Sequence, residues 1–277
     1  MPFLKLIRES SLTGRIGFGI ILLNVGVCLL APVIAPYHES AVVGDVWQPW
    51  SKRFPLGTDH LGRDMITRLF YGARNTISIA LLITSLAFTA GILFGFLAAV
   101  IGGWVDQLLS RAVDVIMAFP TLIFALIVLS ILGTSIPVLI GVISLLSSTR
   151  VYRLSRAIAM DIRVMDFVEV ARLRGEGLYW IMSQEILPNT VAPLLAEFGL
   201  RFCFVFLFIS SLSFLGLGIQ PPSADWGGMV RENAGAITFG IIAPLLPAAA
   251  IAFLTVGVNL VVDWLLHRSA GQVHEGL

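Results

Sequence analysis

The segment of this sequence that most resembles a chemical site is Gly57-Thr58-Asp59-His60-Leu61-Gly62-Arg63-Asp64. Its two glycines have the spacing of a phosphate-binding loop, in which a lysine and a hydroxyl group follow to hold phosphates and Mg²⁺. Here an arginine and an aspartate follow instead, and neither lysine of the chain follows a glycine. We therefore exclude a nucleotide site and expect a turn-rich cap, with Gly57 and Gly62 providing sharp turns.

A metal site in this segment is the weaker interpretation. Asp59 and His60 are residue types that bind metals, but a single histidine is a poor ligand set. The other three histidines are scattered along the chain, at positions 38, 267 and 274. We therefore predict no metal and no cofactor bound by this chain. We expect Asp59, Arg63 and Asp64 to pair with one another or to accept bonds from backbone amides.

The sequence offers no catalytic constellation of a familiar kind, neither HExxH nor GxSxG. Glu197 and Arg201 stand four residues apart with the glutamate first, which is the spacing of an ion pair on one helix face. We interpret them as a structural pair near the inner end of a membrane span, and a role in a transport pathway is the alternative. The chain is therefore predicted not to be an enzyme.

The composition of the chain is apolar, and it determines which kind of structural element positions these residues. Of the 277 residues 57% are hydrophobic and 13% are charged, and the mean hydropathy is +0.92. Because so little polar surface cannot cover a water-soluble protein of this size, we predict a membrane protein in a lipid bilayer. The net charge of +1 gives no basic footprint for nucleic acid.

Apolar runs long enough to cross a bilayer recur about six times, which predicts an all-α polytopic membrane protein. The expected spans are 16–36, 76–101, 112–133, 135–149, 191–218 and 236–262. The first is longer than the apolar region of a cleaved signal peptide, so we expect a signal-anchor helix. With the N-terminus inside, the inner segments carry eleven Lys and Arg residues and the outer segments six. This bias places both termini in the cytoplasm.

The longest predicted inner loop runs from residue 150 to about 190. Its first part has apolar residues at helical spacing, from Val151 to Met165, which indicates an amphipathic helix on the membrane surface. Gly175 and Gly177 are expected to take positive φ and turn the chain. A short helix then restarts at Leu178 and stops at residues 187–189. Such a compact knob can transmit a rigid-body push to a partner protein.

This loop resembles the EAA loop of ABC-importer permeases, in the form found in the dipeptide, oligopeptide and nickel group. The match lies in residues 166–189, with Glu169, Ala171, Gly175 and the run 187–189, whereas Val170 replaces an alanine. The outer segment 55–64 and the stretch 213–227 match the same group. Together these motifs resemble the C-type permease subunit, with a departure after Asp263.

The resemblance implies the type I ABC importer architecture in the bacterial inner membrane. It implies a second, B-type permease, two ABC ATPases that bind ATP and Mg²⁺, and a periplasmic solute-binding protein. The residues it assigns to ATPase coupling are Glu169, Val170, Ala171, Arg172, Arg174, Gly175, Glu176 and Gly177. Contact with the binding protein or substrate is the alternative to the structural cap for residues 57–64.

The expected division of the chain is an anchor helix with a periplasmic loop at 1–75, a transmembrane core at 76–266 and a cytoplasmic tail at 267–277. Within the core the coupling loop covers 150–190. Peptides are the expected cargo, with nickel or a metal chelate as the alternative. A motorless channel or a secondary carrier is the alternative of another class. It is disfavoured because the spans lack ion-coupling residues and the 166–189 loop has no repeat.

Overall fold

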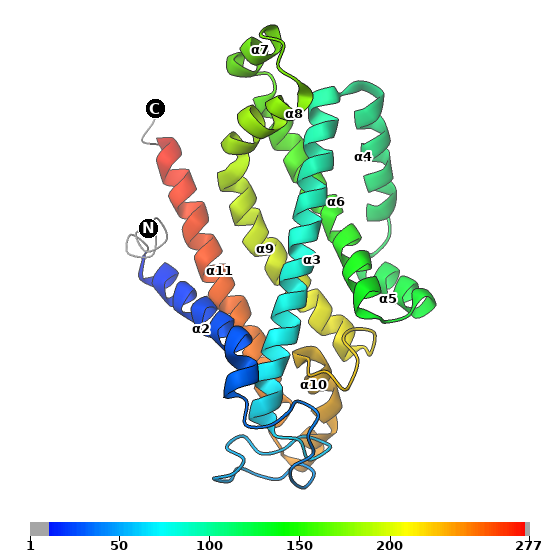
Figure 1. Cartoon of the computed structure of the whole chain (residues 1–277), viewed down its shortest axis with the longest axis vertical. Helices are drawn as coiled ribbons and strands as arrows, with labels where there is room; N and C mark the ends of the chain where they lie inside the picture. Colours follow the sequence, from blue (N-terminus) through cyan, green and yellow to red (C-terminus); the bar gives the residue numbers. More distant parts are fainter. Residues whose placement is uncertain (1–10, 275–277) are drawn as a thin grey trace.

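The computed structural model of the chain describes residues 11–274, with side chains to residue 267. Over that range the structure is helical, and its β-structure consists of two isolated β-bridges in the loop before α3. The helices (Figure 1) are α2 Leu12–Ile34, α3 Met65–Ile101, α4 Gly103–Met117, α5 Thr121–Leu132, α6 Ile136–Ile162, α7 Asp166–Leu173, α8 Leu178–Trp180, α9 Leu187–Phe214, α10 Trp226–Asn233 and α11 Leu245–His274.

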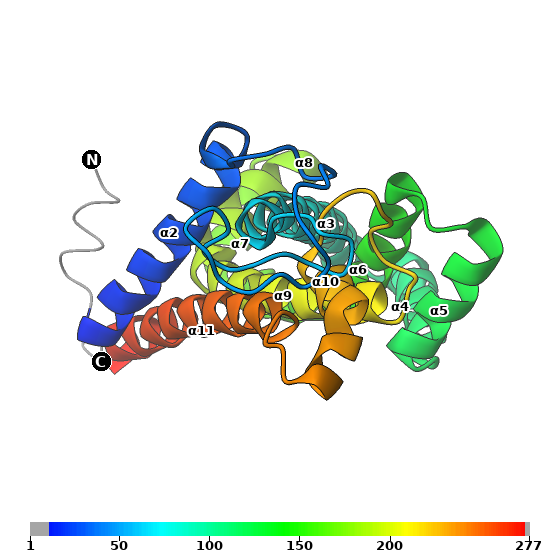
Figure 2. The same cartoon turned by 90° about the horizontal axis from the view of Figure 1, so that it is seen from below.

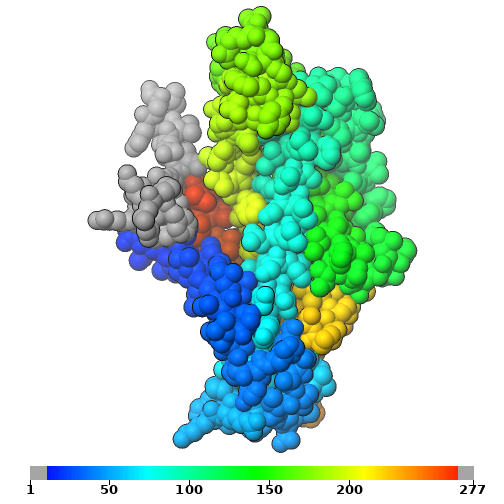
Figure 3. All heavy atoms as spheres, viewed as in Figure 1, coloured from blue at the N-terminus to red at the C-terminus, as the bar shows by residue number. Residues whose placement is uncertain are grey.

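Five of these helical segments are long and apolar enough to cross a membrane, and a sixth is counted if α4 and α5 together form one span. The all-α polytopic fold with about six spans is thereby confirmed. The helices form an elongated bundle, with α7 at one end and the loop between α2 and α3 at the other (Figures 1 and 3). Seen from that loop, α2 and α11 lie side by side (Figure 2).

The packing of α3 against α6 forms the axis of the bundle. Their close approach depends on two glycines of α3, because a Cβ on Gly91 would lie 2.5 Å from Cβ of Val151 and one on Gly95 would lie 2.9 Å from Cβ of Ser155. Small residues at such contacts let membrane helices approach closely. Because α3 has 37 residues, it is about 55 Å long and extends beyond the hydrocarbon layer.

The expected division at residue 75 falls inside α3, which runs unbroken from Met65 to Ile101. Asp64 begins this helix as its N-cap, and its carboxylate accepts bonds from the backbone and the hydroxyl of Thr67 at 2.8 and 2.7 Å. The outer loop is therefore joined rigidly to the first long helix. The three-part division of the chain stays a prediction.

The third expected span, 112–133, is wrong as a single straight helix. The chain forms α4 and α5 there, bent by 85° at a break of three residues. Pro120 lies at that break with ψ 118° and begins α5. The pyrrolidine ring disfavours the helical conformation of the preceding residue, which explains why the helix ends before it.

The fourth expected span is too short, and the surface helix expected after it does not exist as a separate element. Helix α6 continues without a break to Ile162. Val151 of the apolar stripe is buried in a cluster with Phe96 of α3, and Ile162 of the stripe packs against that cluster. The stripe therefore faces α3 rather than the membrane surface, and the connecting loop begins only at Arg163.

The last two spans also differ at their ends. The expected stop at residues 187–189 is wrong, because one turn of π-helix, Ile181–Ile186, joins α8 directly to α9. The final span begins later than expected, at Leu245, because residues 226–239 form α10 and the turn of 3₁₀-helix Ala234–Phe239. Apolar composition alone does not separate these short helices from a span.

Candidate functional site

Helix α7 protrudes from one end of the bundle as a small knob (Figure 3). Val168 and Ala171 are its buried residues and fix it to the bundle. Large apolar side chains are exposed on the rest of the knob: Val164, which precedes the helix, and Phe167, Val170 and Leu173 within it are 72%, 41%, 52% and 81% exposed. An apolar face of this kind, flanked by charges, marks an interaction surface. Glu169 and Arg172 are exposed beside it.

The end of α7 is fixed by a glycine turn. Gly175 has φ +83°, its backbone N–H bonds to the carbonyl of Arg172 at 2.9 Å, and the N–H of Glu176 bonds to the carbonyl of Ala171 at 3.2 Å. These two bonds form the Schellman motif, which favours glycine at the left-handed position. The expectation for Gly175 is confirmed. That for Gly177 is wrong, because its φ is −77° and it begins α8.

Arg174 connects the knob to the base of α9. Its guanidinium carbon lies 5.5 Å from the ring centroid of Trp180, and its Nη2 lies 4.0 Å from a carboxylate oxygen of Glu185. Trp180 and Glu185 were missed by sequence reasoning, because neither has a local signal of its own. The residues that the resemblance assigns to coupling thus divide into an exposed set and a set that holds the knob.

The segment at the other end of the molecule forms the expected ionic cap. One oxygen of Asp59 accepts bonds from the backbone N–H groups of Leu61 and Arg63 at 2.8 and 2.9 Å. The other lies 2.6 Å from Nε of Arg63 and 3.3 Å from Nε of Arg68. Asp59 and Arg68 are 0% and 1% exposed. Thr58 supports the turn by donating its hydroxyl to the carbonyl of Asp45.

Glu232 of α10 completes this cap and was missed by sequence reasoning. Its carboxylate lies 3.0 Å from Nη2 of both Arg63 and Arg68. Asn233 adds bonds to the indole of Trp47 at 3.2 Å and to the backbone N–H of His60 at 3.0 Å. Buried ion pairs therefore hold the outer loop against α3 and α10. Both turn glycines take positive φ as expected, +73° at Gly57 and +77° at Gly62.

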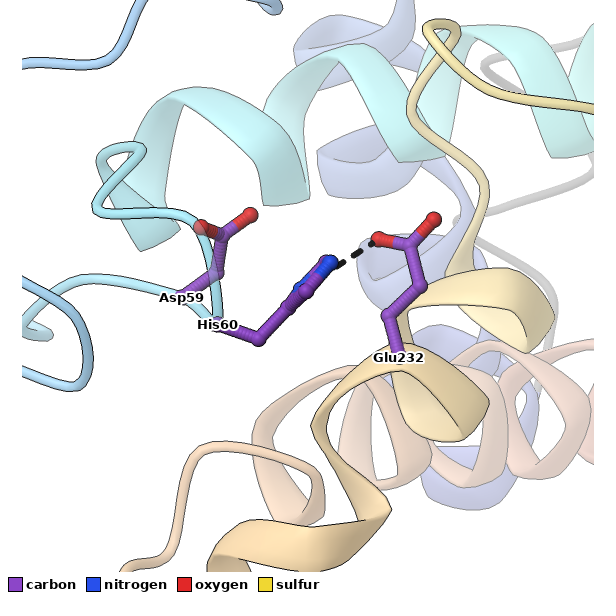
Figure 4. A group of neighbouring side chains, drawn as sticks. All are labelled: Asp59, His60 and Glu232. Atoms are coloured by element: carbon purple, nitrogen blue, oxygen red, sulfur yellow. Dashed lines mark ion pairs between the residues drawn. The ribbon is translucent and has the colours of Figure 1, made fainter.

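Asp59, His60 and Glu232 lie close enough together to suggest a metal site (Figure 4). The carboxylate oxygens that would serve as ligands are, however, already paired with Arg63 and Arg68. A cation would have to displace two guanidinium groups that are themselves buried, and this would leave two buried charges without partners. The arrangement therefore favours a protein-only cap.

The pKa of His60 predicts a pH dependence for this cap. Burial lowers the pKa of the imidazole below its ordinary value of 6.5, aided by Arg63 and Arg68 and opposed by the two carboxylates. As the pH falls through 6.5, the unfolded chain binds a proton that the folded chain does not, so the free energy of unfolding decreases. We expect the melting temperature of the purified protein to fall between pH 7 and pH 5.5, and to fall less in His60→Gln. Equal pH dependence of the two proteins would contradict this.

A second buried carboxylate holds α10 against α3. Asp225 begins α10 and accepts a bond from the backbone N–H of Gly228 at 2.7 Å and another from the hydroxyl of Thr76 at 2.9 Å. Burial raises the pKa of this carboxyl. The indole of Trp226 donates to the carbonyl of Leu69 at 3.0 Å. The stretch 213–227, which matches the permease group in sequence, thus packs α3, α9 and α10 against one another.

The predicted pair of Glu197 and Arg201 is present within α9. Arg201 lies halfway along the 28 residues of α9, and the position of the pair near the inner end of the span stays a prediction. Arg201 is 8% exposed and its guanidinium carbon lies 5.6 Å from the ring centroid of Phe204. A charged pair within a membrane span is costly, and such residues are usually functional.

Comparisons with known proteins agree with this architecture. The family described as the inner membrane component of binding-protein-dependent transport systems matches residues 91–273. The chain is 35% identical over 256 residues to the di/tripeptide transport system permease protein DppC of Pseudomonas aeruginosa. This alignment covers 90% of this chain and 84% of that protein. It is 36% identical over 268 residues to a putative peptide transport system permease of Brucella suis, covering 94% and 88%.

A third relative, the dipeptide transport system permease protein DppC of Haemophilus influenzae, is 30% identical over 257 residues, covering 90% of this chain and 87% of that protein. The apolar helices and the cap thus belong to a multi-pass transport subunit. The chain is a member of the family of inner membrane components of binding-protein-dependent transport systems.

Proposed function

We propose that this chain is the C-type permease subunit of an ATP-driven importer that carries peptides delivered by a periplasmic binding protein. Its partners are a B-type permease, with which it forms the pore, and two ABC ATPases, which bind ATP and Mg²⁺. The observation that carries the proposal is the knob of α7, with its exposed apolar face at the end of the bundle opposite the ionic cap. The names of the relatives favour peptides over nickel or a metal chelate as cargo.

The orientation follows from the same reasoning. We place α7 in the cytoplasm, where an ATPase can receive it, and the ionic cap on the periplasmic side, where the binding protein docks. Both termini then lie in the cytoplasm, in agreement with the bias of Lys and Arg residues. Residues 1–10 and 275–277, which include Lys5 and Arg8 of that bias and the end of the expected tail, lie outside the described residues.

The mechanism transmits a push through the knob. ATP-driven closure of the two ATPases moves α7, and the π-helical turn and α9 carry the movement into the membrane as one continuous element. The contacts of Arg174 with Trp180 and Glu185 keep the knob and α9 in a fixed relation. Such rigid-body coupling fits a switch between inward-facing and outward-facing states.

Two substitutions on the exposed side of α7 test the docking surface. Leu173→Asp puts a charge into the apolar face, and Glu169→Lys reverses a charge beside it. Because both side chains are exposed, each variant is expected to insert normally but to lose most of the ATPase that copurifies with the wild-type protein in mild detergent. Val42→Asp, at another exposed apolar site, in the outer loop, is the control. Unchanged ATPase recovery in both α7 variants would remove this face from the interface.

The whole assembly is tested by affinity purification from native membranes followed by mass spectrometry. We expect a second permease, two ATPases and a binding protein that carries peptides. A binding protein that carries nickel would support the importer assignment but identify nickel as the cargo. Recovery of the second permease without any ATPase would overturn the importer assignment.

A further inference from the structure

A small cavity lies where the break between α4 and α5 meets the middle of α6 and α9. Its volume is about 50 Å³. Four helices contribute side chains to its lining, chiefly Met117, Thr121, Ser147, Thr149, Arg150, Arg201 and Phe204. Two arginines and three hydroxyl groups therefore line one cavity.

The cavity lies beside the middle of two long helices. Arg150 is halfway along the 27-residue α6, as Arg201 is halfway along the 28-residue α9. About 20 Å of helix therefore separates each arginine from either end of its helix. A broken helix within a membrane is tolerated only where its backbone is buried in protein or lines a water-filled cavity. Met117 and Thr121, on the two sides of the break, both line this cavity.

The charges around the cavity do not balance. The guanidinium carbons of Arg150 and Arg201 lie 5.2 and 5.6 Å from the centroid of the same ring, that of Phe204. Arg201 pairs with Glu197 through Nη2, while its Nε is buried without a hydrogen-bond partner. Among the ion pairs of the described residues, none involves Arg150. Arg150, which is exposed, and Arg201 thus bring two cations to one carboxylate, and the buried Nε of Arg201 is left for a ligand to bind.

We propose that this cavity is an anion subsite, which binds a carboxylate of the cargo as it crosses the membrane. Guanidinium groups bind carboxylates through paired, charge-assisted hydrogen bonds. The volume of about 50 Å³ has room for a small polar group, since one water molecule needs a cavity of about 10–15 Å³ by this measure. The rest of the cargo would extend along the pathway. With peptide cargo, the anion is the terminal carboxylate, so this inference rests on the proposed function.

Two other anions could neutralise the arginines. A lipid headgroup would make the arginines a contact with the membrane surface. A carboxylate of the partner permease would instead make them part of the interface between subunits. These sources differ from cargo in one respect: only a site for cargo discriminates between peptides that carry the carboxylate and peptides that lack it.

The test compares uptake of one tripeptide as its free acid and as its C-terminal amide. The complete importer is reconstituted in proteoliposomes, and both forms are supplied at concentrations that saturate the binding protein, so that its own preference does not enter. We expect the wild-type importer to favour the acid by about tenfold, the effect of one charge-assisted hydrogen bond. Arg150→Gln should abolish this preference by slowing uptake of the acid alone.

Three further variants complete the design. Arg201→Gln should act like Arg150→Gln, but its burial endangers folding, so Arg150 is the primary site. Arg150→Lys keeps the charge and should keep part of the preference. Arg153→Gln is the matched control, because Arg153 lies one turn along α6 and pairs with Asp114 at the exposed surface. It should transport both forms as the wild type does.

Each alternative has its own result. If Arg150→Gln slows the acid and the amide equally, or weakens binding of the second permease, the arginines serve the subunit interface and the inference is overturned. If it changes neither, the cavity has no role in transport and the inference is likewise overturned. Failure of the wild-type importer to take up either peptide would instead contradict the proposed function, and the subsite for a peptide carboxylate would fall with it.

Discussion

Gly175→Pro is expected to abolish ATP-driven uptake while the subunit still inserts into the membrane. Proline fixes φ near −65°, whereas the turn after α7 has φ +83° at this position. The substitution also removes the N–H that bonds to the carbonyl of Arg172, and it disfavours the helical conformation that Arg174 adopts at the end of α7. The knob would lose its fixed orientation, and with it the push from the ATPases.

Two milder substitutions separate the turn from its surroundings. Gly175→Ala meets no neighbouring atom within 4 Å, so its cost is the left-handed conformation itself, about 1–2 kcal/mol, and uptake should be reduced but not lost. Gly177→Ala also enters open space, at a φ of −77° that alanine adopts freely, and should behave like the wild type. Normal peptide uptake by Gly175→Pro in proteoliposomes would remove the knob from the mechanism.

Asp59→Asn is expected to destabilise the outer cap by about 3–5 kcal/mol, the usual cost of removing one partner from a buried ion pair. Asparagine preserves the shape of the side chain, and its carbonyl can still accept the backbone bonds from Leu61 and Arg63. Its amide group, however, faces the guanidinium groups of Arg63 and Arg68. The variant therefore isolates the loss of one buried negative charge.

The measurement is the melting temperature of the purified subunit in detergent, followed by proteolysis of the loop between α2 and α3. We expect a clear fall in melting temperature and faster cleavage of the loop. Asp114→Asn is the control, because it breaks an ion pair whose two side chains are 54% and 59% exposed, and exposed pairs contribute little. If both variants melt alike, the buried network does not hold the cap.

The membrane spans could be predicted from the sequence because hydropathy is a local property. A run of about 20 apolar residues predicts a span wherever it lies, and five such helices are present among the described residues. The positive φ of Gly57, Gly62 and Gly175 could likewise be predicted, since glycine favours such turns through its own lack of a side chain. The EAA-like loop was found for the same reason, as a contiguous pattern.

The ends and directions of the helices could not be predicted, because packing decides them. The stripe from Val151 to Met165 was expected to face the membrane surface, but α6 continues to Ile162 because α3 is long enough to cover it. The expected span 112–133 has suitable hydropathy over its length, yet it breaks before Pro120. Composition measures how apolar a segment is, not which neighbour buries it.

By itself, then, the sequence determined that this is an all-α membrane protein, where its apolar segments lie and that Gly57, Gly62 and Gly175 turn the chain. Only the tertiary structure decided which charges far apart in the sequence meet. Arg63 pairs with Glu232, 169 residues away, and Arg150 of α6 converges with Arg201 of α9 on one aromatic ring. The reason is physical. A turn or a pair on one helix forms between residues that are close in the sequence. A contact between distant residues forms only where the packing of whole helices brings the partners together.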